Sequence, residues 1–251
     1  MTPPANETLP AEGWIDIHSH LLPGIDDGCL NLSQSFDCVE KLLERGFSGT
    51  ICTPHIWPAF FPENTPANVA RRVERLRAEL AQAGIDYAIW ASGEVRIDGD
   101  TVRVLKEFGV PTLGPSKNVL VDFWDENWDN SAEEVFRFLL DGDYQPVLAH
   151  PERMLISDKQ LDEVLELTER LGVWLQGNFN SISGGEGPRA TELARRFLDE
   201  DRYYVLAMDM HKPDSLPGRF EGMTRLEDEY GQDRLQTLLH ERPRELLAPA
   251  G

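Results

Sequence analysis

The sequence predicts a parallel α/β fold in which seven strands alternate with helices and close, or nearly close, into a β/α barrel. Short apolar segments rich in β-forming residues recur at regular intervals, and segments with helical periodicity lie between most of them. The strand segments are almost continuously apolar, as expected for parallel strands that are covered on both faces. The alternative is an open, doubly wound sheet.

Strands are expected in seven segments and helices in at least five. The strand segments are residues 14–18 (WIDIH), 49–55 (GTICTPH), 87–95 (YAIWASGEV), 118–124 (NVLVDFW), 146–151 (PVLAHP), 173–178 (VWLQGN) and 203–209 (YYVLAMD). The helical segments are residues 33–46, 66–84, 131–142, 157–172 and 190–201. The length of 251 residues suits one domain, which we place at residues 14–251 after a flexible tail of residues 1–13.

Three segments rich in glycine and proline are expected to be loops. They cover residues 60–68, 181–188 and 211–222, and each follows a predicted strand. In barrel enzymes the loops after the strands build the active site, so a functional site is expected at this end of the fold.

The composition constrains where the protein acts and what it binds. The chain carries 24 Lys and Arg against 44 Asp and Glu, a net charge of -20 that repels nucleic acid and anionic membranes. No secretion signal or membrane span is recognisable, so a soluble cytoplasmic protein is expected. The cysteines, Cys29, Cys38 and Cys52, are expected to be reduced core thiols and not catalytic groups.

Side chains that can bind metal gather at the ends of the predicted strands. Eight of them lie at the ends of six strands: His18, His20, His55, Glu94, Asp122, His150, Asp209 and His211. The carboxyl ends of barrel strands meet at one rim, so these side chains are expected to converge. His18 and His20 are two residues apart on one strand and therefore face the same side, where they can hold one cation.

A single histidine at a strand end is more often structural than functional. The prediction of a metal site therefore depends on the whole set, because unpaired charge at these positions is costly and packing alone favours apolar residues. His240, on a late helix, is assigned to structure. The loop of Asp26, Asp27 and Gly28 is expected to shape the pocket or to support the ligands.

Five motifs resemble those of the polymerase and histidinol phosphatase (PHP) superfamily: DIHSHLLPGIDDG (16–28), TPH (53–55), GEVRI (93–97), AHPER (149–153) and MDMH (208–211). The likeness is greater to its bacterial metal-dependent tyrosine-protein phosphatases, which are associated with capsular and exopolysaccharide synthesis. It implies a distorted seven-stranded β/α barrel with a trinuclear cluster of divalent metals, commonly manganese or iron, with zinc and cobalt as alternatives. It also implies a phosphotyrosine protein as substrate, namely an autophosphorylated bacterial tyrosine kinase.

The resemblance implies a role for each motif residue. His18, His20, Glu94 and Asp209 would bind the first metal, Glu94, Asp122 and His150 the second, and His55 and His211 the third. Asp122 departs from the family pattern, in which glutamate is usual, and its side chain is shorter by one methylene. Metal geometry tolerates only small displacements, so this departure puts the occupancy of the second position in question.

Hydrolysis of a phosphate monoester needs cations, because its anionic oxygens repel the nucleophile. Metals activate water and clamp the phosphoryl oxygens, so the resemblance implies attack by water without a covalent enzyme intermediate. Arg153, and after it Arg219, are expected to bind phosphate through their planar guanidinium groups. Arg96 is a third candidate. Its alternative is a structural ion pair, for which the sequence offers Asp26, Asp27 and Glu152 as partners.

An aromatic leaving group requires an open and partly aromatic acceptor site. Candidates follow two of the predicted ligands: Trp57, Phe60, Phe61, Trp124 and Trp128. Their rings are suited to flank a phenyl ring, with loop anchoring as the alternative for each.

Three functions are compatible with the sequence, and a metal-dependent protein-tyrosine phosphatase is favoured. A small-molecule phosphatase, acting on histidinol phosphate or a sugar phosphate, would use the same cluster in a narrower pocket. A regulatory binding protein with a weakened cluster is the third, and Asp122 is its only support in the sequence. The sequence leaves the native metal, the physiological substrate and the oligomeric state open.

Overall fold

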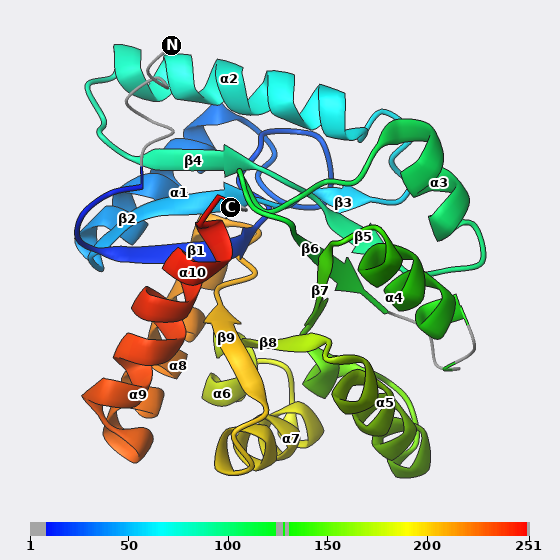
Figure 1. Cartoon of the computed structure of the whole chain (residues 1–251). Helices are drawn as coiled ribbons and strands as arrows, with labels where there is room; N and C mark the ends of the chain where they lie inside the picture. Colours follow the sequence, from blue (N-terminus) through cyan, green and yellow to red (C-terminus); the bar gives the residue numbers. More distant parts are fainter. Residues whose placement is uncertain (1–8, 124–127, 129–130, 250–251) are drawn as a thin grey trace.

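The computed structural model describes residues 9–123, 128 and 131–249 and shows parallel strands alternating with helices (Figure 1). The strands are β1 (Trp14–Ser19), β2 (Phe47–Cys52), β3 (His55–Ile56), β4 (Ala88–Ala91), β5 (Glu94–Arg96), β6 (Asn118–Asp122), β7 (Gln145–Ala149), β8 (Trp174–Asn178) and β9 (Tyr203–Ala207). The helices are α1 (Leu32–Glu44), α2 (Pro66–Gln82), α3 (Thr101–Phe108), α4 (Ser131–Asp141), α5 (Asp158–Leu171), α6 (Phe179–Ser183), α7 (Pro188–Asp199), α8 (Leu216–Tyr230), α9 (Gln232–Gln236) and α10 (Arg242–Leu247). Every predicted strand and helix segment overlaps with an element of the expected type, which confirms the α/β alternation.

The described residues form nine strands and not seven, because the second and third predicted strands are each interrupted. Pro54 lies between β2 and β3, and proline has no N–H to donate to a strand ladder. Gly93 lies between β4 and β5, where a Cβ would come within 2.3 Å of the Ile56 side chain. Beyond these breaks, β3 and β5 pair with His55 directly opposite Glu94. The interruptions therefore bring two predicted ligands side by side.

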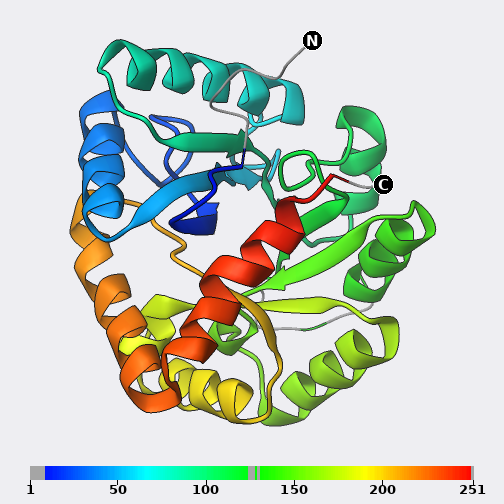
Figure 2. The same cartoon turned by 60° about the vertical axis from the view of Figure 1, so that its left-hand side comes forward.

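The strands form two parallel sheets, one in the order β1-β2-β4 and the other in the order β3-β5-β6-β7-β8-β9. The chain passes from β2 into β3 and from β4 into β5, so the sheets are joined along both segments. At the far edges, Ser19 forms a parallel bridge with Met210, and the His20 N–H donates to the Met210 carbonyl at 2.8 Å. The strands thus surround a common interior, with most of the helices outside (Figure 2).

This interior is filled by apolar side chains. They include Ile15, Ile17, Ile51, Trp90, Leu120, Val147, Val205, Leu246 and Leu247. The last two belong to α10, which runs across one end of the strands (Figure 2). Asn118, the first residue of β6, donates its side-chain amide to the Leu246 carbonyl at 2.7 Å, so α10 covers the amino ends of the strands. The carboxyl ends, where the predicted ligands lie, point away from it.

The predicted loop at residues 211–222 is wrong beyond Ser215, because α8 begins at Leu216. Pro217 lies in the first turn of this helix, where its missing N–H costs no hydrogen bond. Gly222 lies in the helix interior, where a Cβ would come within 2.0 Å of the Phe179 carbonyl oxygen of α6. Here glycine permits close packing of two helices and does not break one.

Replacing Gly222 by alanine is therefore expected to destabilise the protein by about 1–3 kcal/mol, the usual cost of overpacking. Thermal unfolding of the purified variant measures this as a lower Tm. Gly99→Ala is the matched control, because a Cβ at Gly99 meets no atom within 4 Å. Equal Tm values for the two variants would contradict the tight contact between α6 and α8.

The predicted tail, residues 1–13, is described only from residue 9. In this part, Arg244 donates hydrogen bonds to the carbonyls of Pro10 and Gly13, and the Ser48 hydroxyl donates to the carbonyl of Glu12. The described end of the tail is thus attached to α10 and β2. Among the described helices, none combines the length and the apolar character that a membrane crossing requires.

The three cysteines are buried and none forms a disulfide, as expected for core thiols. The Sγ atoms of Cys29 and Cys38 lie 3.7 Å apart. Burial raises the pKa of the Cys52 thiol, which disfavours the thiolate. All three thiols are buried, whereas a catalytic thiol has to be accessible.

Candidate metal centre

Seven of the eight predicted ligands converge where strands of the two sheets end. Together with Asp27, their donor atoms form three groups: His18, His20 and Asp209; His18, Glu94 and His150; and His20, Asp27, His55 and His211. Within each group the donor atoms lie within 4.8 Å of one another. Because the groups share His18 or His20, the described residues contain one continuous cluster.

Glu94 and Asp209 both face the two histidines of the first strand. His18 Nε2 and His20 Nε2 each lie 3.4 Å from Glu94 Oε2 and 3.5 Å from Asp209 Oδ1. Both Nε2 atoms and Glu94 Oε2 are buried without a hydrogen-bond partner in the described part of the chain, which is costly for polar atoms. A cation with ligand bonds of about 2.0–2.2 Å and tetrahedral geometry holds its donors about 3.4 Å apart. These residues therefore fit a divalent metal.

The second group includes the other oxygen of Glu94. Glu94 Oε1 lies 3.1 Å from His150 Nε2, so one carboxylate faces two groups. Asp122 lies outside all three groups, with Oδ1 3.8 Å from His150 Nδ1 and Oδ2 3.8 Å from Arg96 Nη1. Burial raises the pKa of Asp122, and Glu94 nearby raises it further. The shorter side chain at this position thus does not join the cluster.

Asp27 completes the third group, although the sequence indicated only a pocket-shaping loop here. Its Oδ1 lies 3.4 Å from His55 Nε2 and 3.5 Å from His211 Nε2. Gly28 allows the loop to fold onto the first strand, since a Cβ there would lie 2.2 Å from the His20 carbonyl oxygen. In the sequence, Asp26 and Asp27 follow His20 by a few residues, which indicated a role near the ligands. It did not show which of the two aspartates would itself be a ligand.

Asp26 has the other role that the sequence offered, namely support of a ligand. Its Oδ2 lies 2.8 Å from His20 Nδ1, and its carboxylate also accepts from the backbone N–H groups of Gly28 and His55. Burial raises the pKa of Asp26, but His20, the Gly28 N–H and His55 together outweigh burial and lower that pKa, so the carboxylate stays ionised. Asp26 thereby orients His20 with its Nε2 toward Glu94 and Asp209.

Two predicted ligands have an unusual backbone conformation. His150 has φ 32° and Asp209 has φ 46°, both in the left-handed region that non-glycine residues rarely adopt. The His150 N–H donates to the Gln176 carbonyl at 2.7 Å, and this hydrogen bond helps to hold the turn. Strain of this kind is found mainly at functional sites, where the surrounding structure maintains it.

Arg219 is not placed as predicted. Its side chain is buried, and its guanidinium donates to the backbone carbonyls of Met208, Asp209 and Ser215. The backbone thus occupies all three guanidinium nitrogens, so a direct role in phosphate binding is not supported. Arg219 instead holds the strained segment that presents Asp209.

The other two predicted arginines differ in exposure. Arg96 is buried, forms an ion pair with Asp122, which is not among the partners that the sequence offered, and lies over the Trp57 ring at 5.1 Å. Arg153 is 30% exposed; its Nη1 pairs with Asp209, and its Nε lies 3.5 Å from Glu186. Arg153 is therefore the better placed of the two to reach a bound anion.

A hollow of about 230 Å³ opens beside this arginine. It is lined by Phe123, His150, Glu152, Arg153, Met154, Leu155, Glu186, Arg189 and Ala190. The lining combines apolar side chains with charged ones, which suits a ligand with an anionic end and an apolar body.

The aromatic side chains after β3 lie close to the third group. Phe61 stacks on the His55 ring with centroids 5.7 Å apart, and Trp57 packs on Phe60 at 4.0 Å. Phe60 is 65% exposed, whereas Trp128 packs on Phe123. The predicted residue Trp124 lies outside the described residues.

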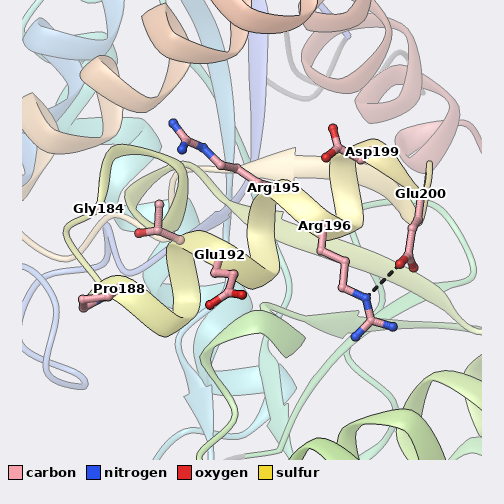
Figure 3. Close-up of a pocket in the computed structure, with 8 residues that line it drawn as sticks. Gly184, Pro188, Glu192, Arg195, Arg196, Asp199 and Glu200 are labelled. Atoms are coloured by element: carbon pink, nitrogen blue, oxygen red, sulfur yellow. Dashed lines mark hydrogen bonds and ion pairs between the residues drawn. The ribbon is translucent and has the colours of Figure 1, made fainter.

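A second, broader hollow of about 750 Å³ lies along α7 and shares no residue with the three groups (Figure 3). Its lining side chains include Arg195 and Arg196, which pair with Glu229 and Glu200, respectively. These paired charges describe a solvated helix face, and we assign no site there.

In the metal-free protein, stability is expected to fall as the pH rises from about 6.5 to about 10. Burial lowers the pKa of His55, but Glu94 and Asp27 outweigh it and raise that pKa from 6.5 to about 10. A histidine with a raised pKa binds its proton more tightly when the protein is folded. Its contribution to stability is therefore complete below pH 6.5 and is lost as the pH rises through 10.

Thermal unfolding in the presence of chelator at pH 6, 8 and 10 measures this dependence. The expected decrease in the free energy of unfolding is on the order of a few kcal/mol. A Tm that is constant over this range would show that the histidines are not paired with carboxylates in the metal-free protein.

Comparison with known proteins identifies a family and several relatives of this chain. A sequence profile described as "Capsular polysaccharide synthesis, CpsB/CapC" matches residues 14–248. Tyrosine-protein phosphatase YwqE of Bacillus subtilis (strain 168) is 28% identical over 197 residues, which are 78% of this chain and 77% of the relative. Tyrosine-protein phosphatase CpsB of Streptococcus agalactiae is 27% identical over 241 residues, which are 93% and 98% of the two chains.

Solved structures show the same fold. One described with the words "YwqE from Bacillus subtilis and CpsB from Streptococcus pneumoniae, unique metal-dependent tyrosine phosphatases" matches with a TM-score of 0.80 and 27% identity, covering 93% of this chain and 94% of that one. A histidinol phosphate phosphatase of Lactococcus lactis shares the fold at a TM-score of 0.53 and 11% identity, covering 86% and 93%. Since the family profile spans nearly the whole sequence, the chain belongs to the CpsB/CapC family of capsular polysaccharide synthesis.

Proposed function

We propose that this protein is a metal-dependent phosphatase that hydrolyses phosphotyrosine in proteins. The observation that carries the proposal is the continuous cluster of histidines and carboxylates, in which three buried donor atoms have no hydrogen-bond partner within the described residues. Membership of the CpsB/CapC family, with relatives named tyrosine-protein phosphatases, supports this substrate class. The proposed substrate is an autophosphorylated bacterial tyrosine kinase of polysaccharide synthesis in the cytoplasm.

The proposed fold is a single distorted seven-stranded β/α barrel of residues 14–251. The continuity of β2 with β3 and of β4 with β5 reduces the nine strands to seven chain segments. The bridge between Ser19 and Met210 supports closure of the ring between the first and last segments.

The proposed cofactor is a trinuclear cluster of divalent cations, with manganese as the first choice. His18, His20, Glu94 and Asp209 would hold the first, Glu94 and His150 the second, and Asp27, His55 and His211 the third. Asp122 would reach the second only if its strand or side chain shifted. When bound, such cations supply Lewis-acid stabilisation of the phosphoryl oxygens and an activated water as nucleophile.

The protein's own residues would bind and orient the substrate. The Arg153 guanidinium, held beside the cluster by Asp209 and Glu186, would donate to the phosphoryl oxygens. The phenyl ring would lie in the adjoining hollow, against Phe123 and Met154. A tyrosine side chain fits this arrangement because its apolar ring separates the phosphate from the polypeptide.

The experiment that tests the proposal combines elemental analysis of freshly purified protein with phosphate release from a phosphotyrosine peptide. Release is measured with manganese and with chelator. Two to three metal ions per chain together with release that the chelator abolishes are the expected results. Metal without peptide hydrolysis, but with rapid hydrolysis of histidinol phosphate or a sugar phosphate, would replace the proposal with a small-molecule phosphatase. Less than one metal ion per chain and no turnover would favour a regulatory binding protein.

A further inference from the structure

Gln176, in the middle of β8, is a fully buried glutamine that contacts a predicted ligand. Its Oε1 lies 2.8 Å from His18 Nδ1, and both side chains have no exposed surface. Its Nε2 donates to the Gly177 carbonyl at 2.7 Å. Burying an amide is costly unless its donors and acceptors are paired, so a glutamine at this strand position requires a reason.

The two hydrogen bonds of Gln176 determine which way its amide points. A backbone carbonyl only accepts, so the group that faces Gly177 must be the NH₂ of the amide. The oxygen then faces His18 and can only accept, which places a hydrogen on His18 Nδ1. In the neutral ring this leaves a lone pair on Nε2, the atom that faces Glu94 and Asp209 without a hydrogen bond in the described part of the chain.

The neighbouring histidines are held in other ways. His20 Nδ1 faces the Asp26 carboxylate at 2.8 Å, and His211 Nδ1 faces the Asp209 carbonyl at 3.0 Å. A carboxylate at position 176 would be a third beside His18 and would add negative charge to a cluster that already contains Glu94, Asp209 and Asp27. A neutral amide fixes the ring without adding that charge.

Gln176 also contacts a second predicted ligand through its backbone. Its carbonyl accepts from the His150 N–H at 2.7 Å, at the residue with φ 32°. One strand residue therefore connects His18, from the first strand, with His150, which follows β7.

We propose that Gln176 is a positioning residue that selects the Nδ1-H tautomer of His18 and so presents Nε2 as a metal ligand. This inference rests on the proposed metal centre, but its test does not depend on phosphatase activity. Partners of this kind typically contribute 10–100-fold to metal affinity.

The test uses Gln176→Leu, which keeps the approximate volume but removes the acceptor, and Gln176→Glu, which restores an acceptor. Gln145→Leu in β7 is the matched control, because the hydrogen bonds that the Gln145 amide forms with described residues go to the backbone carbonyls of Pro146 and Gly172, neither of which is a predicted ligand. Two measurements are made on chelator-treated protein: the tautomer of His18 by long-range ¹⁵N–¹H NMR, and the Kd for Mn²⁺ by calorimetric titration.

The wild type and Gln145→Leu are expected to show His18 protonated at Nδ1, with equal Mn²⁺ affinity. Gln176→Leu is expected to lose this tautomer preference and to bind Mn²⁺ about 10–100-fold more weakly. If Gln176→Leu does not fold, the His18 tautomer is measured in Gln176→Glu instead. Its carboxylate is an acceptor and is expected to keep the hydrogen on His18 Nδ1. An Nε2-H tautomer in the wild type, or unchanged tautomer and affinity in Gln176→Leu, would overturn the proposal. Failure to hydrolyse phosphotyrosine would affect only the proposed function.

Discussion

Glu94→Gln is expected to reduce phosphate release from a phosphotyrosine peptide by at least about 100-fold and to lower the metal content of the purified protein. Losses of 10–100-fold are typical when an outer partner of a ligand is removed, and Glu94 lies in the cluster itself. Its Oε2 is 3.4 Å from His18 Nε2 and 2.9 Å from His55 Nδ1, and its Oε1 is 3.1 Å from His150 Nε2. An amide offers one acceptor, carries no charge and turns a donor toward one of these nitrogens.

The measurement is elemental analysis of the variant together with its kcat in saturating manganese. His240→Ala is the control, since His240 accepts a hydrogen bond from Arg244 and packs against Trp14, outside the three groups. Its activity is expected to remain within about two-fold of the wild type. Comparable losses in the two variants would show that the cluster is not the active site.

Arg153→Ala is expected to lower kcat/KM by about 10²–10³-fold while leaving most of the metal bound, because a donor to the charge of a transition state typically contributes this much. The Arg153 side chain combines partial exposure with a position beside Asp209, and the hollow for the phenyl ring opens next to it. Arg153→Lys is expected to recover only part of the loss, since an ammonium keeps the charge but not the planar pair of donors.

The kinetics of both variants are compared with those of Arg195→Ala, which removes an exposed arginine paired with Glu229 on the outer side of α7. This control is expected to behave as the wild type. If Arg153→Ala lost metal in proportion to activity, Arg153 would act by orienting Asp209 and not by binding phosphate. The metal content measured beside kcat/KM separates these two roles.

The sequence predicted the parts of this structure that depend on local pattern. Apolar segments with polar residues at their ends were sufficient to place His18, His55 and His150 at strand ends, because strand position determines where such a side chain points. The break at Pro54 follows from proline's missing N–H, whereas the break at Gly93 involves its close approach to Ile56, which lies far away in the sequence. The sequence therefore predicted a strand in each of the seven segments but did not predict that the second and third would be divided.

The same limit explains the site residues that the sequence did not resolve. Asp26 and Asp27 are adjacent and chemically identical, and only the turn of their loop decides that one supports His20 and the other faces His55. The role of Arg219 follows from the start of α8 at Leu216, because this helix places the guanidinium where it donates to the Asp209 carbonyl. The reach of Asp122 likewise depends on the position of a strand, which residue type does not determine.

The contact between Ser19 and Met210 determines when, during folding, the predicted ligands can come together. His18 and His20 leave the ribosome early, whereas Asp209 and His211 follow only when most of the chain has been made. Joining Ser19 to Met210 closes a loop of most of the chain, and this costs chain entropy before the stabilising contacts form. The first and last strands are therefore expected to pair late in folding. A nascent or truncated chain thus offers scattered histidines with low affinity for metal. With the cluster as proposed, metal uptake would therefore mark a finished chain, and metal released by damage to either terminal strand would mark the loss of the complete cluster.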